Sequence, residues 1–173
     1  MSKAFTKEDD AGDVLVPRPV SPLPSGARNH LTAGGARRLQ AELARLGDEL
    51  RPALLARLNE PGLAGADAQE ALQHVEQRLA YLQQSLQTAE IAAPPPPPHD
   101  IVRFGATVGV RDQHGAETTY RIVGVDEADF ARNEVSWLSP VARALLNARL
   151  GQKVPFKFPG GAAQLEIIRI AYD

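Results

Sequence analysis

The sequence predicts an α+β protein in which an antiparallel coiled-coil hairpin precedes a small domain built on a mostly antiparallel sheet. Two apolar rows with spacings of three and four residues indicate the two helices of the hairpin. A run of five prolines, 94–98, follows the second row, and beyond it the hydrophobic period changes to two. These observations indicate two units, a helical one and a β-rich one, which are joined by the proline run as a spacer.

The two apolar rows share one midpoint. They consist of Leu39, Leu43, Leu46, Leu50, Leu54 and Leu58, and of Leu72, Val75, Leu79, Leu82, Leu86 and Ala89. Paired in opposite directions, the residue numbers of every pair sum to between 128 and 130, and helix breakers (Pro61, Gly62 and Gly65) lie at the midpoint. This arithmetic predicts a hairpin within residues 31–92. The alternative is a structural coiled-coil dimer, in which the rows pair between chains.

Capping signals predict where these helices begin. Thr32 is a suitable N-cap for the first helix, and Pro52 predicts a kink or local distortion within it. Asp67 is predicted to cap a second helix over residues 67–91, because Glu70 follows three residues later as in a capping box. The proline run is expected to end this helix.

Proline also marks the flanking segments. Residues 1–30 are predicted to be a disordered, proline-rich tail, because alternating prolines from Pro17 to Pro24 prevent helix formation and remove ladder donors. A short docking strip for a partner is the alternative. Residues 93–100 are predicted to be a polyproline linker.

The C-terminal domain is predicted to span residues 101–173. The alternating pattern indicates strands at 107–111, 118–123, 135–138, 153–158 and 164–171. A short helix is expected over 141–147, with Ser139 at the N-cap and Pro140 at the first helical position.

Composition excludes several classes of function. The formal charge of −2 gives no overall case for nucleic-acid binding, and the absence of cysteine excludes disulfides and thiolate metal sites. No apolar run approaches the length of a membrane span, so a cytoplasmic location without membrane contact is expected. The histidines lack metal-ligand spacing and are expected to be exposed: His30, His74, His99 and His114.

No nucleophile elbow or phosphate-binding loop occurs, so an enzyme with its own catalytic residues is not expected. The remaining candidate groups are the carboxylates near the hairpin crease, Glu60, Asp67 and Glu70, and the surface around Ser139 and Pro140. The first helix also carries Arg37, Arg38, Arg45, Arg51 and Arg57, with Arg78 on the second. A solvated helix face is the favoured interpretation of these arginines over an RNA-tracking strip.

Several runs of this sequence resemble the bacterial Gre transcript-cleavage and elongation factors, and the run at residues 139–146 favours the GreB branch. They are residues 31–43, Arg51-Pro52, Ala89-Glu90-Ile91, Phe104-Gly105-Ala106, residues 120–127 and residues 139–146. The resemblance covers residues 31–173. It implies an FKBP-like C-terminal domain that docks on RNA polymerase at the rim of its secondary channel, while the coiled coil enters the channel. DNA and RNA would be met only within the transcription complex.

The resemblance also implies roles for individual residues. Polymerase docking would fall to the helix-start motif, Ser139, Pro140, Arg143, Ala144 and Leu145. Asp67 and Glu70 would be the metal-binding residues at the tip, helping the polymerase to hold a catalytic Mg²⁺ that activates water. The protein alone is expected to bind no cofactor, and to be a monomer.

Three departures from the family pattern bear on this transfer. The stretch between Arg51-Pro52 and Ala89-Glu90-Ile91 is about eight residues shorter than usual, which shortens each arm by roughly 5 to 6 Å. Ala71 stands where the family carries Asn, and Leu138 stands where it usually carries an acid. An acid at position 138 would be expected to pair with a basic surface of the polymerase. With Leu138 in its place, the affinity of docking is expected to be weaker or to respond differently.

The leading hypothesis is therefore a Gre-type regulator that binds RNA polymerase and has weakened or lost cleavage stimulation. The alternative is a fully active cleavage factor that uses Asp67 and Glu70 to hold Mg²⁺. A further alternative is the short-coiled-coil regulator type that has been linked with nucleoside diphosphate kinase, although its finger is much shorter than the hairpin predicted here.

Overall fold

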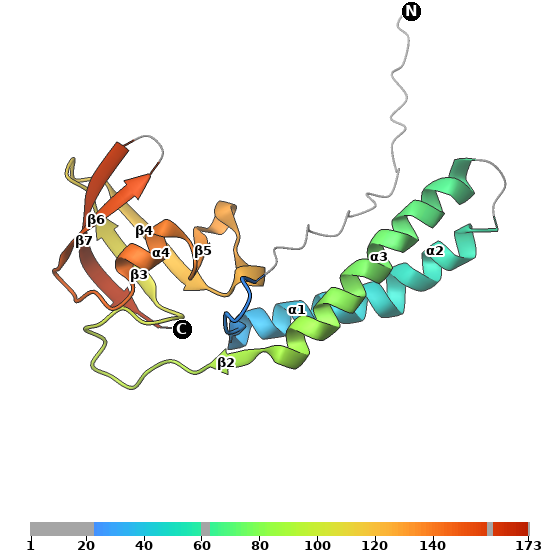
Figure 1. Ribbon diagram of the computed structural model, residues 1–173, viewed down its shortest axis with the longest axis horizontal. Helices are drawn as coiled ribbons and strands as arrows, with labels where there is room; N and C mark the ends of the chain where they lie inside the picture. The colour runs from blue at the N-terminus through green and yellow to red at the C-terminus, as the bar shows by residue number, and fades with distance from the viewer. Residues whose placement is uncertain (1–22, 60–62, 159–160, 173) are drawn as a thin grey trace, which may run out of the picture.

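The computed structural model describes residues 23–59, 63–158 and 161–172. The predicted α+β class is confirmed: a long helical hairpin extends from a domain that contains the larger sheet (Figure 1). The predictions for tail residues 1–22 and for Glu60, Pro61 and Gly62 lie outside the described residues. No helix within the described ranges combines the length and apolar composition needed to cross a membrane.

The first arm of the hairpin consists of a short strand and three helical segments. They are β1 (His30–Thr32), α1 (Ala33–Arg45), the π-helix η1 (Leu46–Leu50) and α2 (Arg51–Arg57). Thr32 is the N-cap as predicted, because its side-chain oxygen accepts a hydrogen bond from the Gly35 amide at 2.9 Å.

The local distortion predicted at Pro52 is confirmed as the π-helical segment directly before it. Pro52 has no N–H to donate to an earlier carbonyl. In the turn that leads into it, the Arg51 amide bonds to the carbonyl of Leu46, five residues back. One wide turn thus accommodates the proline without ending the arm.

The predicted bounds of the second helix are wrong at both ends. Helix α3 spans Leu63–Thr88, so Asp67 lies inside the helix and the predicted capping box with Glu70 does not form. A helical glycine such as Gly65 costs only about 1 kcal/mol, which burial of the seam offsets from Ala68 onward. After α3, strand β2 (Glu90–Ala92) pairs in parallel with β1, so α3 ends before the prolines.

Leucines from both arms are buried along the predicted seam. The buried apolar residues are Leu31, Ala36, Leu39, Leu46, Leu54, Ala68, Val75 and Leu82. Ion pairs between described residues cross from one arm to the other, as in Arg51 with Glu76 and Glu42 with Arg78. Along the first arm Glu42 comes before Arg51, whereas their partners on the second arm come in the opposite order, Arg78 after Glu76. The two arms therefore run antiparallel, which confirms the predicted hairpin within one chain.

The larger sheet has the strand order β5-β4-β3-β7-β6. Its strands are β3 (Thr107–Arg111), β4 (Glu117–Val123), β5 (Glu134–Ser136), β6 (Lys153–Phe158) and β7 (Gly161–Ala171). All neighbours are antiparallel except β4 and β5, which are parallel. The third strand starts at Glu134 and ends at Ser136, earlier than the predicted 135–138, because the chain turns at Trp137 toward helix α4 (Pro140–Leu145).

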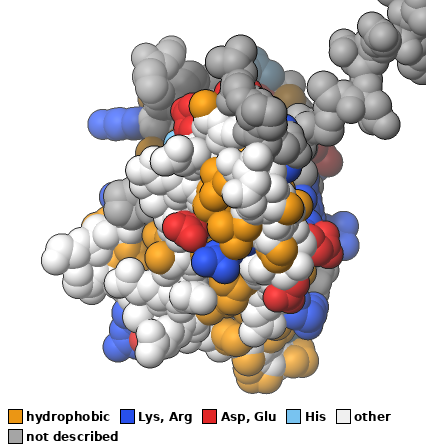
Figure 2. Space-filling view, turned by 90° about the vertical axis from the view of Figure 1, so that its right-hand side faces the viewer, with side chains coloured by type: hydrophobic (Ala, Val, Ile, Leu, Met, Phe, Trp, Pro, Cys, Tyr) orange, Lys and Arg blue, Asp and Glu red, His pale blue; other side chains and the backbone are white. Residues whose placement is uncertain are grey.

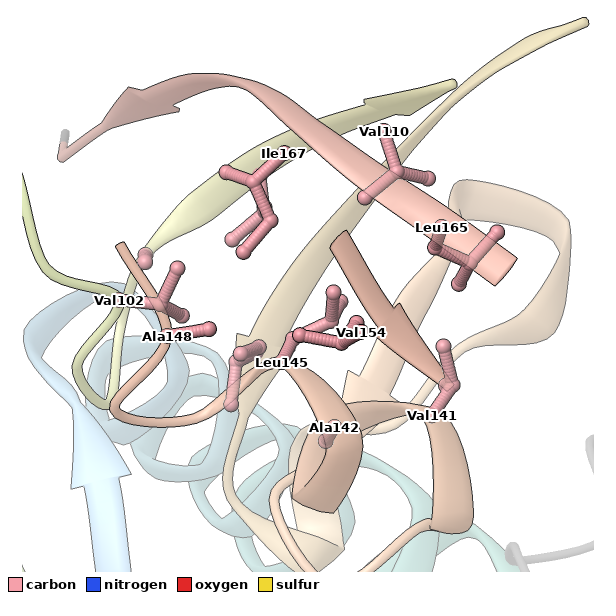
Figure 3. Close-up of a cluster of buried hydrophobic side chains, with 12 residues drawn as sticks. Val102, Val110, Val141, Ala142, Leu145, Ala148, Val154, Leu165 and Ile167 are labelled. Carbon is pink, nitrogen blue, oxygen red and sulfur yellow. The ribbon is translucent and has the colours of Figure 1, made fainter. Parts of the chain in front are cut away.

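Helix α4 covers one face of this sheet and closes its core. Figure 3 shows Ala142 and Leu145 of α4 within a cluster that also contains Val154 and Ile167. Leu145 and Ile167 are both fully buried. Burying a side chain of this size contributes about 1.5 to 3 kcal/mol, so α4 is held to the sheet by its apolar face.

Candidate functional site

The tip carboxylates predicted from the sequence lie behind the start of α3. Asp67 and Glu70 are both exposed, four and seven residues after Leu63, the first residue of the helix. At 1.5 Å per residue they lie about 6 and 10 Å along the axis from the helix start. Figure 2 looks along the hairpin from its tip end, where described acidic and basic side chains are interspersed rather than gathered.

Asp67 and Glu70 could supply part of a Mg²⁺ ligand set. Residues three apart on a helix are neighbours on its surface, and carboxylate oxygens are preferred ligands of Mg²⁺. Magnesium takes octahedral coordination, which two carboxylates alone do not complete. Within the described ranges, no three His, Cys, Asp or Glu side chains gather in a way that could hold a metal ion. The donor pair therefore fits a shared ion, with the other ligands supplied from outside.

The predicted docking residues divide between surface and core. Pro140 and Arg143 are exposed at the start of α4, and Ala144 is half-buried beside them. Ser139 is the N-cap of α4, its hydroxyl accepting from the Ala142 amide at 3.2 Å. Leu145 is fully buried in the domain core, so its side chain supports the helix and is not presented to a partner. The surface of this motif is therefore made by Pro140 and Arg143, with Leu138 half-buried next to them.

The structure also reveals a junction between hairpin and domain that sequence reasoning missed. Glu127, on the 3₁₀ turn η2 (Val125–Glu127), is buried at 3% exposure. One carboxylate oxygen accepts from the Thr32 amide at 2.7 Å and from the Gly124 amide at 3.0 Å. The other accepts from the Thr32 hydroxyl, and Arg38 lies 3.8 Å from it. One side chain thus fixes the start of α1 against the domain.

The residue before Glu127 holds the other arm of the hairpin. The Asp126 carboxylate accepts from the Tyr81 hydroxyl at 2.6 Å and from the Ser85 hydroxyl at 2.7 Å, both on α3. Burial raises the pKa of Tyr81, and the hydrogen bond to Asp126 raises it further. Two consecutive acids on η2 therefore connect both helices to the domain.

Two glycines make this junction possible. A Cβ on Gly35 would lie 1.9 Å from a carboxylate oxygen of Glu127, and one on Gly124 would lie 2.3 Å from the carbonyl of His30. Any larger residue would push the hairpin and the domain apart. The only signal in the sequence was the position of these residues within the runs 31–43 and 120–127 that carried the family resemblance.

Comparison with known proteins relates the chain to one described family. Residues 97–172 match the family model described as "Transcription elongation factor, GreA/GreB, C-term". A relative named transcription elongation factor GreB, from Neisseria meningitidis serogroup B, is 33% identical over 84% of this chain and 94% of its own length. A GreA from Anaeromyxobacter sp. strain K is 36% identical over 82% of this chain and 91% of its own length.

The chain belongs to the GreA/GreB family of transcription elongation factors. Relatives of both names match at similar identity, so the comparisons do not favour the GreB branch. Among solved structures, a GreA/GreB factor from Nitrosomonas europaea has a TM-score of 0.41 at 22% identity and covers 84% of this chain and 99% of its own. Gfh1 of Thermus thermophilus has a TM-score of 0.39 at 23% identity, covering 84% of this chain and 99% of its own.

Two of the four histidines of this GreA/GreB family member are not simply exposed as predicted. The centroid of the His30 ring lies 5.6 Å from the ring centroids of both Phe104 and Trp137. The centroid of the His99 ring lies 4.7 Å from that of Tyr172. Both are half-buried, whereas His74 and His114 are exposed as predicted. The aromatic contacts explain the difference, because linker and strand histidines meet the domain surface.

The arginine pattern also separates into two roles. Arg37, Arg45, Arg51 and Arg57 are exposed on the first arm, as a solvated helix face requires. Arg78 is only 4% exposed, and its guanidinium donates two hydrogen bonds to Glu42, at 2.9 and 3.0 Å. Arg78 is therefore a structural residue that joins α3 to α1 and is not available to RNA.

Proposed function

We propose that this GreA/GreB family protein binds RNA polymerase through its C-terminal domain and inserts its hairpin into the secondary channel. In this proposal it regulates elongation, pausing or initiation, while its stimulation of transcript cleavage is weakened or lost. It acts as a monomer in the bacterial cytoplasm, touches no membrane, and meets nucleic acid only within the transcription complex. Family membership supports the polymerase as partner, because relatives named transcription elongation factor align over most of this chain.

The position of the tip carboxylates is the observation that carries the proposal of weak cleavage. Asp67 and Glu70 lie one to two turns behind the start of α3, and Ala71 follows them. Carboxylate oxygens contact Mg²⁺ at about 2.0 to 2.1 Å, so a setback of a helical turn would leave these groups short of the ion unless the hairpin inserts more deeply. The shorter stretch between Arg51-Pro52 and Ala89-Glu90-Ile91 acts in the same direction.

Asp67 and Glu70 would hold the magnesium ion if cleavage is retained. That ion would supply an activated water for attack on the transcript. The two side chains would do no more than contribute carboxylate oxygens, because the remaining ligands would come from the polymerase. The protein would in this case be an accessory factor and not an enzyme in its own right.

The exposed start of α4 supports the proposed docking. Ser139 holds the first turn of the helix, and Leu145 anchors it to the core. This leaves Pro140 and Arg143 exposed on a rigid base, and rigid presentation lowers the entropic cost of binding. Leu138 carries no charge, so the affinity is expected to depend less on salt than that of a relative with an acid at this position.

Competition for core RNA polymerase tests the docking. The protein should displace a labelled, cleavage-active family member, and Arg143→Glu should weaken the competition about tenfold or more through charge reversal at the interface. Arg149→Glu is the matched control, because Arg149 is also exposed but lies outside α4. Absence of competition by the unmodified protein would show that the docking proposal is wrong.

Cleavage of a backtracked transcript tests the second half of the proposal. Halted complexes should cleave at nearly the background rate with this protein and rapidly with a cleavage-active relative. If the unmodified protein stimulates cleavage strongly, and the double change Asp67→Asn with Glu70→Gln abolishes it, the protein is a full cleavage factor. The exposure of both carboxylates near the tip is the observation that favours this second candidate.

A further inference from the structure

A cleft of about 560 Å³ lies where the base of the hairpin meets the C-terminal domain. Its walls come from the first turns of α1, the segment after β2, the loop before β3 and strand β4. The residues that matter here are Gly34, Arg37, Arg38, Phe104, Arg121 and Tyr172. This cleft lies at the end of the hairpin opposite its tip, so neither proposed polymerase contact uses it.

The lining of the cleft is basic. Three arginines contribute to it, and none of the described residues that line it is acidic. Behind the lining, the buried carboxylates of Glu127 and Glu134 lie 3.8 and 3.2 Å from Arg38 and partly neutralise it, so the cleft keeps a modest excess of positive charge. Such a concave basic surface attracts small anions, because low-dielectric walls focus the field of the charges.

Arg38 is held in place from behind the cleft. Its guanidinium donates to the buried carboxylate of Glu134 at 3.2 Å through the nitrogen that also lies 3.8 Å from Glu127, and the side chain remains 40% exposed. A guanidinium has five N–H donors, so this contact leaves donors for a ligand. Arg37 precedes it on α1 and is exposed. Arg121 comes from β4, so the cations approach from two different parts of the fold.

The backbone at the start of α1 leaves room for a ligand on the cleft side. Gly34 lines the cleft, and a Cβ there would meet only the Thr32 hydroxyl oxygen, at 3.8 Å, so the first turn is open to a ligand. No acidic side chain occupies the first turn of this helix. The buried Glu127 carboxylate accepts from the Thr32 amide at this end of the helix, so the positive charge offered to a ligand comes from the arginines and not from the helix dipole.

We propose that this cleft binds a small phosphorylated anion, either inorganic pyrophosphate or the phosphate chain of a nucleotide. Guanidinium groups match phosphate oxygens in paired hydrogen bonds, and the exposed Arg37 together with the remaining donors of Arg38 suits a phosphate-bearing ligand. The volume falls within the usual range of small-molecule sites. Phe104 and Tyr172 supply apolar wall on the domain side, against which a nucleoside could rest.

Titration calorimetry on the full-length protein tests this proposal. Pyrophosphate, GTP and ATP are the probes, and guanosine and adenosine are the uncharged controls, all in magnesium-free buffer at low salt. Both phosphorylated classes should bind, the nucleosides should not, and affinity should fall as salt is raised. Tighter binding of a nucleotide than of pyrophosphate would identify the nucleotide as the source of the phosphate, and equal or weaker binding would identify the inorganic ion.

Two variants locate the binding in the cleft. Arg37→Ala should weaken binding about tenfold, and Gly34→Asp should weaken it at least as much by placing a carboxylate in the first turn. Gly34→Asp should melt close to the temperature of the unmodified protein, because a Cβ at Gly34 meets only the Thr32 hydroxyl oxygen at 3.8 Å, so its loss of binding would not reflect unfolding.

Arg45→Ala is the matched control, since Arg45 is an exposed arginine of the same helix that does not line the cleft. The control should bind as the unmodified protein does. No binding of either phosphorylated class at 1 mM would overturn the proposal. Binding that Arg37→Ala and Gly34→Asp leave unchanged would overturn it equally.

Discussion

The carboxylate of Glu127 accepts hydrogen bonds from both the amide and the hydroxyl of Thr32, a residue 95 positions earlier in the chain. Thr32 caps the first helix of the hairpin, and Glu127 belongs to the C-terminal domain. Together with Asp126, which holds α3, this buried side chain fixes the hairpin against the domain, and Figure 1 shows the direction in which the hairpin extends. Because this contact joins the hairpin to the domain, its loss is expected to affect the stability of both.

Glu127→Gln should lower the free energy of unfolding by about 2 to 3 kcal/mol. The amide group would replace one accepting oxygen by a donor that faces other donors, leaving buried groups unsatisfied. Urea denaturation of the full-length protein measures the change. Glu117→Gln is the control, because Glu117 is exposed, pairs with Arg111 across a hairpin and should change the stability by less than about 1 kcal/mol. Equal effects of the two substitutions would contradict the assigned role of Glu127.

Two adjacent glycines should respond in opposite directions to alanine. Gly35→Ala places a methyl group 1.9 Å from a Glu127 oxygen and should destabilise the protein by about 2 kcal/mol. Gly34→Ala meets only an ordinary contact at 3.8 Å and should stabilise it by up to about 1 kcal/mol through helix propensity. Thermal unfolding of both variants measures the difference, and a stabilising Gly35→Ala would show that the junction is looser than described.

Arg78→Met should destabilise the hairpin by about 2 kcal/mol or more, because it leaves the partly buried carboxylate of Glu42 without its partner. Adding Glu42→Gln should recover part of this loss, which a double-mutant cycle in urea measures. Arg51→Met is the control. Its ion pair with Glu76 is exposed on both sides, so its removal should cost less than about 1 kcal/mol.

The stability of the protein should fall at alkaline pH, in part through Tyr81. Burial raises the pKa of Tyr81 in the folded state above its value of about 10 in the unfolded chain. The contribution of the neutral phenol is therefore fully present below pH 10 and is lost as the pH rises beyond it. Melting temperatures measured from pH 8 to 11 should fall less steeply for Tyr81→Phe.

A residual alkaline slope is expected in Tyr81→Phe, because burial also raises the pKa of Tyr172. Tyr81→Phe should in addition melt at a lower temperature at pH 8, since the hydrogen bond to Asp126 is absent. An unchanged slope in Tyr81→Phe would mean that Tyr81 does not contribute to the alkaline loss.

The hairpin illustrates how far local patterns reach. The apolar rows predicted its pairing, and Thr32 and Pro52 predicted the N-cap and the distorted turn, because seam spacing, capping and the missing proline N–H act over a few residues. The predicted start at Asp67 was wrong for the same reason. The capping signal at Asp67 predicted that the helix begins there. Packing along the seam instead stabilises a helix that includes Gly65 and begins at Leu63.

The sequence by itself determined the hairpin, the strands of the sheet, the short capped helix and the family, since each depends on near-neighbour chemistry or on runs of residues. Only the tertiary structure decided that Glu127 and Asp126 tie both helices to the domain. It alone also placed Leu145 in the core and gathered Arg37, Arg38 and Arg121 around one cleft. These contacts join residues that are far apart in the chain. The hydrophobic pattern around each residue predicts its own helix or strand but not the distant residue that it meets.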